Sequence, residues 1–357
     1  MPRIRNDLSK IPVYSPGKPI DEVMRELGLD DIVKVASNES PVPPWPEVQE
    51  AIAAAASTTN RYPDMTAHIL TQAIAGYQGV DPEHIWVGAG STQLITLITL
   101  AAAEPGTTTV FADPSFVVYP IATLLAGADA IKVPLDRAHR HDLAAMAAAV
   151  REDTRVVYVC NPNNPTGTHV AGDALGELVD AIPSDVLVMV DEAYGEYVTA
   201  PDWSTAIPLA LERDNVVVTR TFSKIFGLAG LRVGYAIGAP RTLAAFLATQ
   251  PPFSVTTLGQ TAATEALRHV DRLEQRVKEN ELGREWLTAE LTHRGYEVPP
   301  SQANFILVLP GDDAAGIGER MLHEGVIVRP MGNAIRISVG TEGENERVMA
   351  AWDVATA

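Results

Sequence analysis

A lysine, two hydroxyl residues and an arginine lie close together in the second half of the chain. Lys224 ends the run Thr221-Phe222-Ser223-Lys224, and Arg232 follows eight residues later. Two hydroxyls and a guanidinium, which can bind in bidentate fashion, suit a phosphate group. A lysine amine beside them can form a Schiff base with an aldehyde. Pyridoxal 5'-phosphate (PLP) is a cofactor that uses such a lysine, so this stretch predicts a PLP site.

A carboxylate follows another predicted strand. Asp191 comes directly after the apolar run 186–190, and a charge at the end of such a strand is costly unless a positive group pairs with it. A pyridinium nitrogen is such a group, and keeping it protonated makes the cofactor ring an electron sink. Taken alone, Asp191 could also be a helix cap. Its position 33 residues before Lys224 favours the cofactor role.

Two loops extend this set of candidates. Residues 88–92, Gly-Ala-Gly-Ser-Thr, follow the run 85–87 and open a helix, which predicts an anion site, although an ordinary helix cap is the alternative. Residues 161–167, Asn-Pro-Asn-Asn-Pro-Thr-Gly, follow the run 156–160 and predict a rigid loop with fixed amide side chains, or else a plain turn. Ligands of open α/β sheets bind beyond the carboxyl ends of the strands, where all these loops are expected.

Composition limits the class of protein. The chain has 357 residues, which predicts two domains, and its 46% hydrophobic and 20% charged residues are ordinary for a soluble enzyme. A formal net charge of −18 argues against a nucleic-acid partner, which needs a basic footprint. The single cysteine, Cys160, excludes an internal disulfide and a multi-cysteine metal site, and it is expected to be a packed core thiol.

Location and metal binding are also constrained. No apolar stretch approaches the roughly 18 residues that a membrane span needs, and the N-terminal residues lack the apolar core of a signal peptide. The cytoplasm is therefore expected. His139 and His141 stand in a polar run, 136–142, which predicts a solvated loop rather than a metal site.

The elements divide into three segments. Residues 1–35 are expected to form an N-terminal arm and part of a small domain. Residues 36–250 alternate apolar runs with Ala- and Leu-rich helical stretches, which predicts a large α/β domain with a mostly parallel sheet covered by helices on both faces. Residues 251–357 carry long amphipathic helices and short strands, which predicts a smaller α+β domain.

The chain resembles the fold-type I PLP-dependent aminotransferases of class I and II. Within them it is most similar to the histidinol-phosphate aminotransferase family and its actinobacterial phenylalanine and aromatic amino acid aminotransferases. The resemblance covers nearly the whole chain. The motifs that carry it, in the family's order, are Tyr14-Ser15-Pro16-Gly17-Lys18, Ser37-Asn38-Glu39, Arg61-Tyr62-Pro63-Asp64, 161–167, Asp191-Glu192-Ala193-Tyr194, 221–224, 227–232 and 334–340.

The resemblance implies roles around the cofactor. Lys224 would be the Schiff-base lysine and proton carrier, Asp191 the partner of the pyridinium nitrogen, and Tyr194 a further catalytic residue. The residues implied to hold the other cofactor groups are Gly90, Ser91, Thr92, Thr221, Ser223 and Arg232 for the phosphate, Asn164 and Tyr194 for the phenolic oxygen, and Phe116 for stacking on the ring.

The resemblance also implies substrate and partner contacts. Arg336 would clamp the substrate α-carboxylate, with Arg329 as a second arginine for a phosphate, and Asn38 would lie in the segment that closes over the substrate. Tyr62 would reach the phosphate in a neighbouring subunit, so a homodimer is expected. If the amino donors are aromatic amino acids, the residues expected to form an apolar side-chain pocket are Tyr14, Phe116, Tyr119 and Phe253. The alternative for each of them is an aromatic of the core.

Two positions depart from the family pattern. The run 40–44 lacks the glycine usual a few residues after Asn-Glu, and Phe116 replaces the more usual tyrosine, which keeps ring stacking but loses a hydroxyl. The predicted function is amino-group transfer between an aromatic amino acid and 2-oxoglutarate. The alternatives are a histidinol-phosphate aminotransferase, a PLP-dependent decarboxylase of a phosphorylated amino acid, and a PLP-binding regulator that is not an enzyme.

Overall fold

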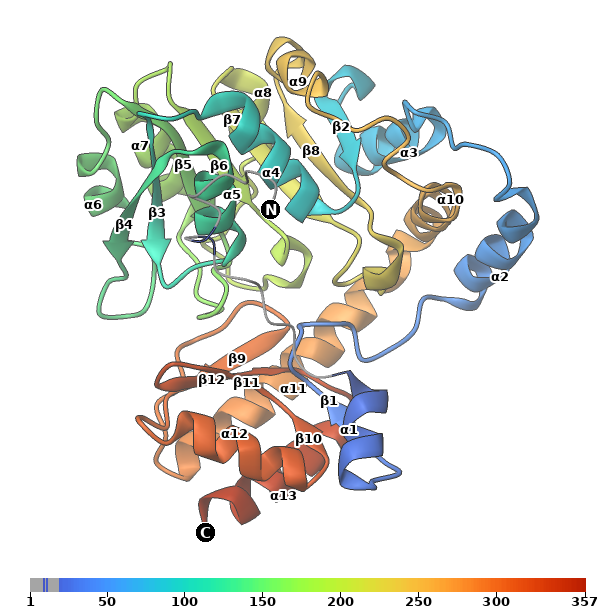
Figure 1. Ribbon diagram of the computed structural model, residues 1–357, viewed down its shortest axis with the longest axis vertical. Helices are drawn as coiled ribbons and strands as arrows, with labels where there is room; N and C mark the ends of the chain where they lie inside the picture. Colours follow the sequence, from blue (N-terminus) through green and yellow to red (C-terminus); the bar gives the residue numbers. More distant parts are fainter. Residues whose placement is uncertain (1–8, 10, 12–18) are drawn as a thin grey trace, which may run out of the picture.

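The computed structural model describes residues 9, 11 and 19–357 and has two lobes, one large and one small (Figure 1). The large lobe is built on a seven-stranded sheet in the order β2-β8-β7-β6-β5-β3-β4. Its strands are β2 (Ile85–Gly88), β3 (Thr108–Asp113), β4 (Asp129–Pro134), β5 (Thr154–Cys160), β6 (Leu187–Asp191), β7 (Val216–Thr221) and β8 (Gly234–Gly238). Only β8 runs antiparallel to its neighbours, which agrees with the mostly parallel sheet predicted from the continuous apolar runs.

Helices cover both faces of this sheet. One apolar cluster packs one face against α4, α5 and α9, and the other cluster packs the opposite face against the remaining helices of the lobe. The helices are α2 (Pro46–Ala55), α3 (His68–Gln78), α4 (Ser91–Ala102), α5 (Val118–Ala126), α6 (Leu143–Ala148), α7 (Gly172–Ala181), α8 (Ile207–Glu212), α9 (Pro240–Leu247) and α10 (Thr257–Ala266). Short 3-10 helices occur at Ala56–Thr58, Pro82–His84, Gly195–Tyr197, Ala229–Leu231 and Leu267–Arg272.

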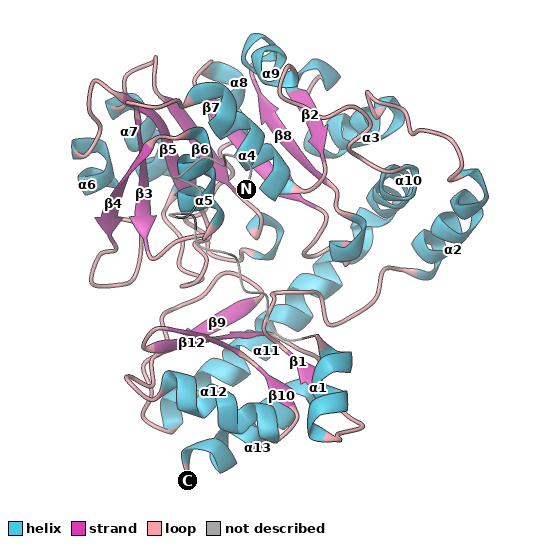
Figure 2. Ribbon diagram, in the orientation of Figure 1, coloured by secondary structure: helices cyan, strands magenta, loops and turns pink. Residues whose placement is uncertain are grey.

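The small lobe has its own core around the fully buried Trp352. β1 (Val33–Lys34) pairs with β10 (Val326–Ile327) in parallel, and β11 (Arg329–Met331), β12 (Ala334–Ser338) and β9 (Phe305–Val308) form an antiparallel sheet. Its helices are α1 (Ile20–Leu27), α12 (Ala314–His323) and α13 (Glu342–Thr356). Figure 2 shows the long helix α11 (Leu273–His293) running from the large lobe into the small one.

The predicted α/β architecture with a smaller α+β unit is confirmed. The division at residues 35 and 250 stays a prediction, and α10, which lies after residue 250, packs against α2 and α3 of the large lobe. None of the helices in the described ranges is long and apolar enough to cross a membrane.

The prediction of a solvated loop is wrong for His141. This side chain is buried, and burial lowers its pKa to about 4, so the ring is neutral. His139 does contact solvent, and its Nε2 lies 2.9 Å from Glu297 Oε1 of the small lobe. The loop contacts Thr168, whose hydroxyl donates to the His139 carbonyl, and Glu297 of the small lobe. Its polar composition does not indicate these contacts.

Candidate active site

Three neighbouring strands bring the main candidate residues to one edge of the large sheet. β5 ends at Cys160, before the loop 161–167, and Cys160 lies beside Asp191 at the end of β6. Asp191 in turn lies beside Thr219 on β7, whose end leads into Ser223 and Lys224. Because these strands are parallel, their carboxyl ends meet at one edge, as the sequence predicted.

Asp191 is buried and accepts three hydrogen bonds. Its Oδ2 accepts from the Tyr119 hydroxyl at 3.0 Å, and its Oδ1 accepts from Thr219 Oγ1 and from the Ala193 N–H, both at 3.3 Å. It forms no ion pair of 4 Å or less with any described residue. Burial raises the pKa of Asp191 to about 6, against the opposing effect of these donors. A cation placed against it would relieve that cost.

Lys224 reaches towards the join between the lobes. Its Nζ donates to the Asn38 carbonyl at 3.0 Å and, more weakly, to the Ser37 carbonyl at 3.5 Å. Burial and the positive charges of Arg336 and Arg232 together lower the pKa of Lys224 to about 8. A larger share of the amine is therefore neutral near pH 7 than in an exposed lysine, as a nucleophile or base requires.

Three of the predicted phosphate residues lie at or after the end of β7. Thr221 Oγ1 donates to Ser223 Oγ at 2.9 Å, and Arg232 Nη1 donates to the same Ser223 oxygen at 3.1 Å. Arg232 has a left-handed backbone, φ 54°, which is costly for a side chain of this size and is typical of ligand clamps. Gly90, with φ +82°, lies so close to the Arg232 guanidinium that a side chain at this position would displace the guanidinium.

The N-terminus of α4 completes this cradle. Ser91 is buried at the first position of the helix, directly after Gly90, where backbone N–H groups lack partners within the helix. The Thr92 residue is exposed in the single chain. The donor set of hydroxyls, helix N–H groups and one guanidinium is that of an anion site.

Tyr194 is held between two amides. Its hydroxyl accepts from Asn38 Nδ2 at 3.0 Å and from Asn164 Nδ2 at 3.4 Å. Asn38 has φ 53°, a left-handed conformation that asparagine tolerates better than most residues. The Lys224 amine lies 5.6 Å from the centroid of the Tyr194 ring. Asn38, Asn164, Tyr194 and Lys224 therefore form one connected group.

Arg336 extends this group from the small lobe. Its Nη1 donates to Asn164 Oδ1 at 2.5 Å, and its Nη2 donates to the Ala36 carbonyl at 2.8 Å. Its guanidinium lies 5.5 Å from the centroid of the Phe305 ring. Arg329 faces Arg336 across the β11–β12 pair, so the two side chains project from the same face of the sheet.

Sequence reasoning missed several residues that shape the site. Ser338 Oγ accepts from the Asn38 N–H at 2.8 Å and bonds to Asn38 Oδ1 at 3.2 Å, and Asn304 Nδ2 donates to the Asn38 carbonyl. The alternation of side chains along a strand could have identified Ser338. It stands two residues after Arg336 and therefore projects from the same face of the sheet. The placement of Tyr119 in the substrate pocket is wrong, because this residue is fully buried behind Asp191.

Two other predicted residues, Tyr62 and Phe253, lie on the surface of the chain. Tyr62 is 82% exposed and stacks on Phe253, which is 41% exposed, with ring centroids 4.6 Å apart. Tyr14 falls outside the described residues. Phe116 is half-buried, and its ring meets Tyr119 edge-on at 5.7 Å.

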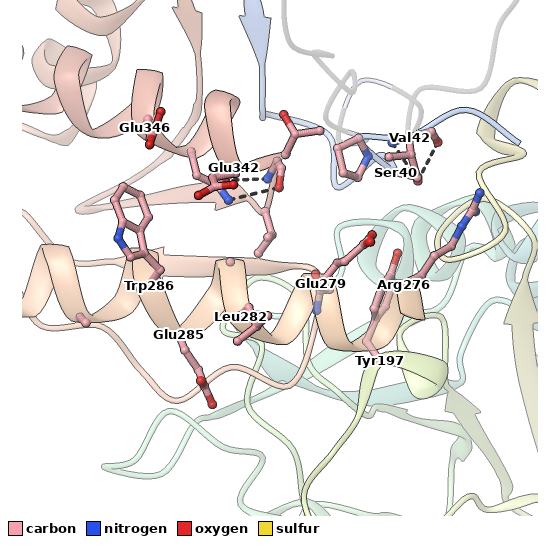
Figure 3. Close-up of a pocket in the computed structure, with 18 residues that line it drawn as sticks. Ser40, Val42, Tyr197, Arg276, Glu279, Leu282, Glu285, Trp286, Glu342 and Glu346 are labelled. Atoms are coloured by element: carbon pink, nitrogen blue, oxygen red, sulfur yellow. Dashed lines mark hydrogen bonds between the residues drawn. The ribbon is translucent and has the colours of Figure 1, made fainter. Parts of the chain in front are cut away.

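The unusual run 40–44 has a well-defined shape. Ser40 Oγ donates to the Val42 carbonyl at 2.9 Å, and the Arg276 guanidinium donates to the Pro43 carbonyl at 2.9 Å. A cavity of about 890 Å³ opens between this run, α11 and the start of α13 (Figure 3). Its lining contains Trp286 and Glu342 but none of the predicted site residues.

The residues at the sheet edge fit the cofactor that the sequence implied. No cation among the described residues forms an ion pair with the buried Asp191 carboxylate. The close approach of Gly90 to Arg232 leaves backbone and guanidinium donors for a phosphate, and Lys224 provides an amine of lowered pKa. A positively charged ring nitrogen, a phosphate and an aldehyde are the three groups that PLP carries.

Comparisons with known proteins agree with this geometry. The family model for aminotransferase class I and II matches residues 30–351. The chain is 44% identical to an aromatic amino acid aminotransferase of Nocardia farcinica, over 96% of this chain and 95% of that one. It is 40% identical to a histidinol-phosphate aminotransferase of Moorella thermoacetica, over 98% of this chain and 92% of the other.

A solved structure supports the same relationship. The crystal structure of histidinol-phosphate aminotransferase from Sinorhizobium meliloti in complex with pyridoxal-5'-phosphate superposes with a TM-score of 0.91 and 30% identity, covering 99% of this chain and 98% of that one. The resemblance inferred from the motifs is thereby confirmed, and the chain belongs to the aminotransferase class I and II family.

Proposed function

We propose that the protein is a PLP-dependent aminotransferase that moves an amino group between an aromatic amino acid and 2-oxoglutarate. The connected group Lys224–Asn38–Tyr194–Asn164–Arg336 supports the reaction type, because it joins an amine of lowered pKa to a guanidinium suited to a carboxylate. The observation that carries the aromatic substrate is the 44% identity to the aromatic amino acid aminotransferase of Nocardia farcinica.

The chain would hold the cofactor through four sets of residues. Bound here, PLP would supply an aldehyde for amine exchange and a ring that accepts electrons from the substrate Cα. The proposed contacts are Asp191 for the ring nitrogen, Asn164 and Tyr194 for the phenolic oxygen, Phe116 for the ring face, and Ser91, Thr92, Thr221, Ser223 and Arg232 for the phosphate.

Lys224 would carry out the proton transfer. With a substrate bound, the Lys224 amine would take the proton from the substrate Cα. Nζ must be neutral for this step, and the burial and neighbouring cations that lower its pKa to about 8 favour that state. The Asn38 and Ser37 carbonyls accept hydrogen bonds from Nζ and so fix its direction.

Arg336 would orient the substrate by its α-carboxylate. Both Nη atoms already donate, to Asn164 and to Ala36, so the planar fork is held in place before substrate arrives. Because Asn164 also donates to Tyr194, the same amide would link the carboxylate clamp to the cofactor side of the site.

Histidinol phosphate is the second candidate substrate. It has no α-carboxylate, and its phosphate would need more positive charge than one arginine supplies. The pairing of Arg329 with Arg336 across β11 and β12 favours this candidate, as does the 40% identity to the Moorella thermoacetica enzyme.

A comparison of amino donors tests the proposal. Phenylalanine, tyrosine and histidinol phosphate would each be assayed with 2-oxoglutarate. We expect the highest kcat/KM for the aromatic amino acids. A higher value for histidinol phosphate would replace the proposed substrate and keep the reaction type, whereas release of carbon dioxide without 2-oxoglutarate would favour a decarboxylase and contradict both.

A homodimer and a cytoplasmic location complete the proposal. Tyr62 and Phe253 form an exposed aromatic stack, and Met65 and Ile69, which follow Tyr62 closely in the sequence, are exposed as well. Exposed large apolar side chains of this kind favour an interface. The Tyr62 side chain is free of its own chain's core, as a contact to the phosphate in a second subunit would require.

A further inference from the structure

We propose that Tyr119 is a positioning residue for the cofactor, which acts by fixing the Asp191 carboxylate in the ionised state and orientation that a protonated ring nitrogen needs. This inference rests on the proposed function, which requires Asp191 to contact the ring nitrogen of the cofactor. It replaces the substrate-pocket role predicted for Tyr119 from the sequence.

The first argument is the geometry of the contact. Tyr119 lies on α5, is 0% exposed, and donates its hydroxyl to Asp191 Oδ2 at 3.0 Å. The two donors to Oδ1, Thr219 and Ala193, are longer at 3.3 Å. Tyr119 therefore donates the shortest of the hydrogen bonds that restrict rotation of the Asp191 carboxylate.

The second argument is that the ring of Tyr119 cannot easily move. It stacks on Tyr158 with a centroid distance of 4.7 Å and an interplanar angle of 18°, and it meets Phe116 edge-on. Phe116 is the residue proposed to stack on the cofactor ring, so one side chain contacts both the residue on the ring face and the carboxylate at the ring nitrogen. Movement of Tyr119 would disturb both.

The third argument is electrostatic. Burial raises the pKa of the Tyr119 hydroxyl well above its ordinary value, so it stays a donor at every working pH. Burial raises the pKa of Asp191 to about 6, and the Tyr119 hydroxyl is the strongest of the hydrogen bonds that oppose this rise. Without it the carboxylate would take up a proton closer to neutral pH and would hold a cationic nitrogen less well.

The neighbours of Asp191 allow its ionisation to be measured separately from theirs. The titratable groups that face it are Tyr119, Cys160, Tyr194 and Lys224. Burial raises the pKa of Cys160 and of Tyr194 above their ordinary values, so both are neutral below pH 7. Lys224, with a pKa lowered to about 8, is mostly charged there. Between pH 4 and pH 7, Asp191 is therefore the group of this set that changes charge.

Tyr119→Phe tests the proposal, with Tyr158→Phe as the matched control. Tyr158 is equally buried and belongs to the same stacked pair, but its hydroxyl bonds to Thr99 Oγ1 at 2.7 Å and not to Asp191. The first measurement is dissociation of PLP from the holoenzyme, followed by absorbance during dialysis. We expect Tyr119→Phe to weaken PLP binding about tenfold or more, since hydrogen bonds to charged groups are the strong class, and Tyr158→Phe to change it little.

The second measurement uses the full chain freed of PLP. Its melting temperature would be recorded from pH 4 to pH 7.5 for wild type, Tyr119→Phe, Asp191→Asn and the double variant. The fall in stability due to Asp191 ionisation, which ends near pH 6 in wild type, should continue to about one pH unit higher in Tyr119→Phe. This extension should vanish on the Asp191→Asn background.

The outcomes distinguish an error in the role of Tyr119 from an error in the role of Asp191. If Tyr119→Phe binds PLP as wild type does, or shifts the melting curves equally with and without Asp191, Tyr119 is only a packing residue and the proposal is wrong. If Asp191→Asn also binds PLP unchanged, the assignment of Asp191 in the proposed function fails instead.

Discussion

Arg336 and Asn164, 172 positions apart in the sequence, share a hydrogen bond of 2.5 Å across the two lobes. The amide of Asn164 also donates to the Tyr194 hydroxyl. Asn164 therefore connects Arg336 of the small lobe directly to Tyr194 of the large lobe. This contact suggests that substrate orientation and the cofactor environment are set together.

Arg336→Lys should raise KM for the amino donor and for 2-oxoglutarate together. Lysine keeps the charge but cannot reproduce the planar fork that donates to Asn164 and Ala36. Both substrates carry an α-carboxylate, so both should lose about tenfold or more in apparent affinity. Steady-state kinetics with each substrate varied in turn measures this.

Arg329→Lys is the matched control for this variant. Arg329 lies opposite Arg336 in the strand pair, and it should affect phenylalanine little if it is not the carboxylate clamp. A larger KM effect from Arg329→Lys than from Arg336→Lys would exchange the roles of the two arginines.

Covalent attachment of PLP to Lys224 should have an unusually low pH midpoint. Only the neutral amine attacks the aldehyde, and burial with the nearby Arg336 and Arg232 charges lowers the pKa of Lys224 to about 8 from 10.5. The attachment rate of PLP-free protein, followed by absorbance, should therefore rise through about pH 8. Arg336→Gln removes a positive charge, raises the lysine pKa and should move the midpoint upward. Lys224→Ala should form no borohydride-stable link, and a wild-type midpoint above pH 10 would contradict the lowered pKa.

Asp191→Asn should stabilise the PLP-free protein at pH 8 while it impairs turnover. Burial raises the pKa of Asp191 to about 6 from 3.8, so its contribution to stability is present below pH 3.8 and is lost as the pH rises through 6. That loss is roughly 3 kcal/mol. Asparagine cannot ionise and avoids it, but it also cannot keep a ring nitrogen protonated.

Urea unfolding of the PLP-free protein at pH 4 and pH 8 measures this difference. The exposed Asp185→Asn is the control and should give equal effects at both pH values. An Asp191→Asn protein that is no more stable than wild type at pH 8 would show that Asp191 ionises without cost.

The residues that follow strands were predictable, and those that depend on contacts between lobes were not. Lys224, Asp191 and the 161–167 loop stand directly after apolar runs, and the edge of a parallel sheet brings such positions together whatever the rest of the chain does. Ser338 and Asn304 bond to Asn38 from 300 and 266 positions away, and their residue types alone are common surface polar residues. Nothing local to them indicates a partner at that distance.

The aromatic residues were the hardest to assign from the sequence. A tyrosine near a site can line a pocket or fill a core, and sequence spacing does not separate these roles. Tyr119 turned out to be buried behind Asp191, whereas Phe253 lies on the surface against Tyr62. The deciding factor in both cases is the packing of α5 and of the loop after residue 250, which only the folded chain defines.

Mixing two inactive variants should restore activity if Tyr62 completes the site of a second subunit. Tyr62→Phe keeps the ring that stacks on Phe253 and removes only the hydroxyl expected at the phosphate. Lys224→Ala removes the amine. A hybrid dimer of the two would carry one site with native Tyr62 and native Lys224, so activity should rise above that of either parent after subunit exchange.

Lys224→Ala mixed with Arg336→Lys is the control for this experiment. Arg336, Asn164, Tyr194 and Asn38 are connected to Lys224 by hydrogen bonds within one chain, so no hybrid of these two variants contains a native site. This mixture should stay at the level of its parents. Complementation by the control pair would mean that Arg336 acts across the subunit boundary. Proven exchange without complementation in the Tyr62 pair would place Tyr62 outside the partner's site, and its exposed stack with Phe253 would then need another partner.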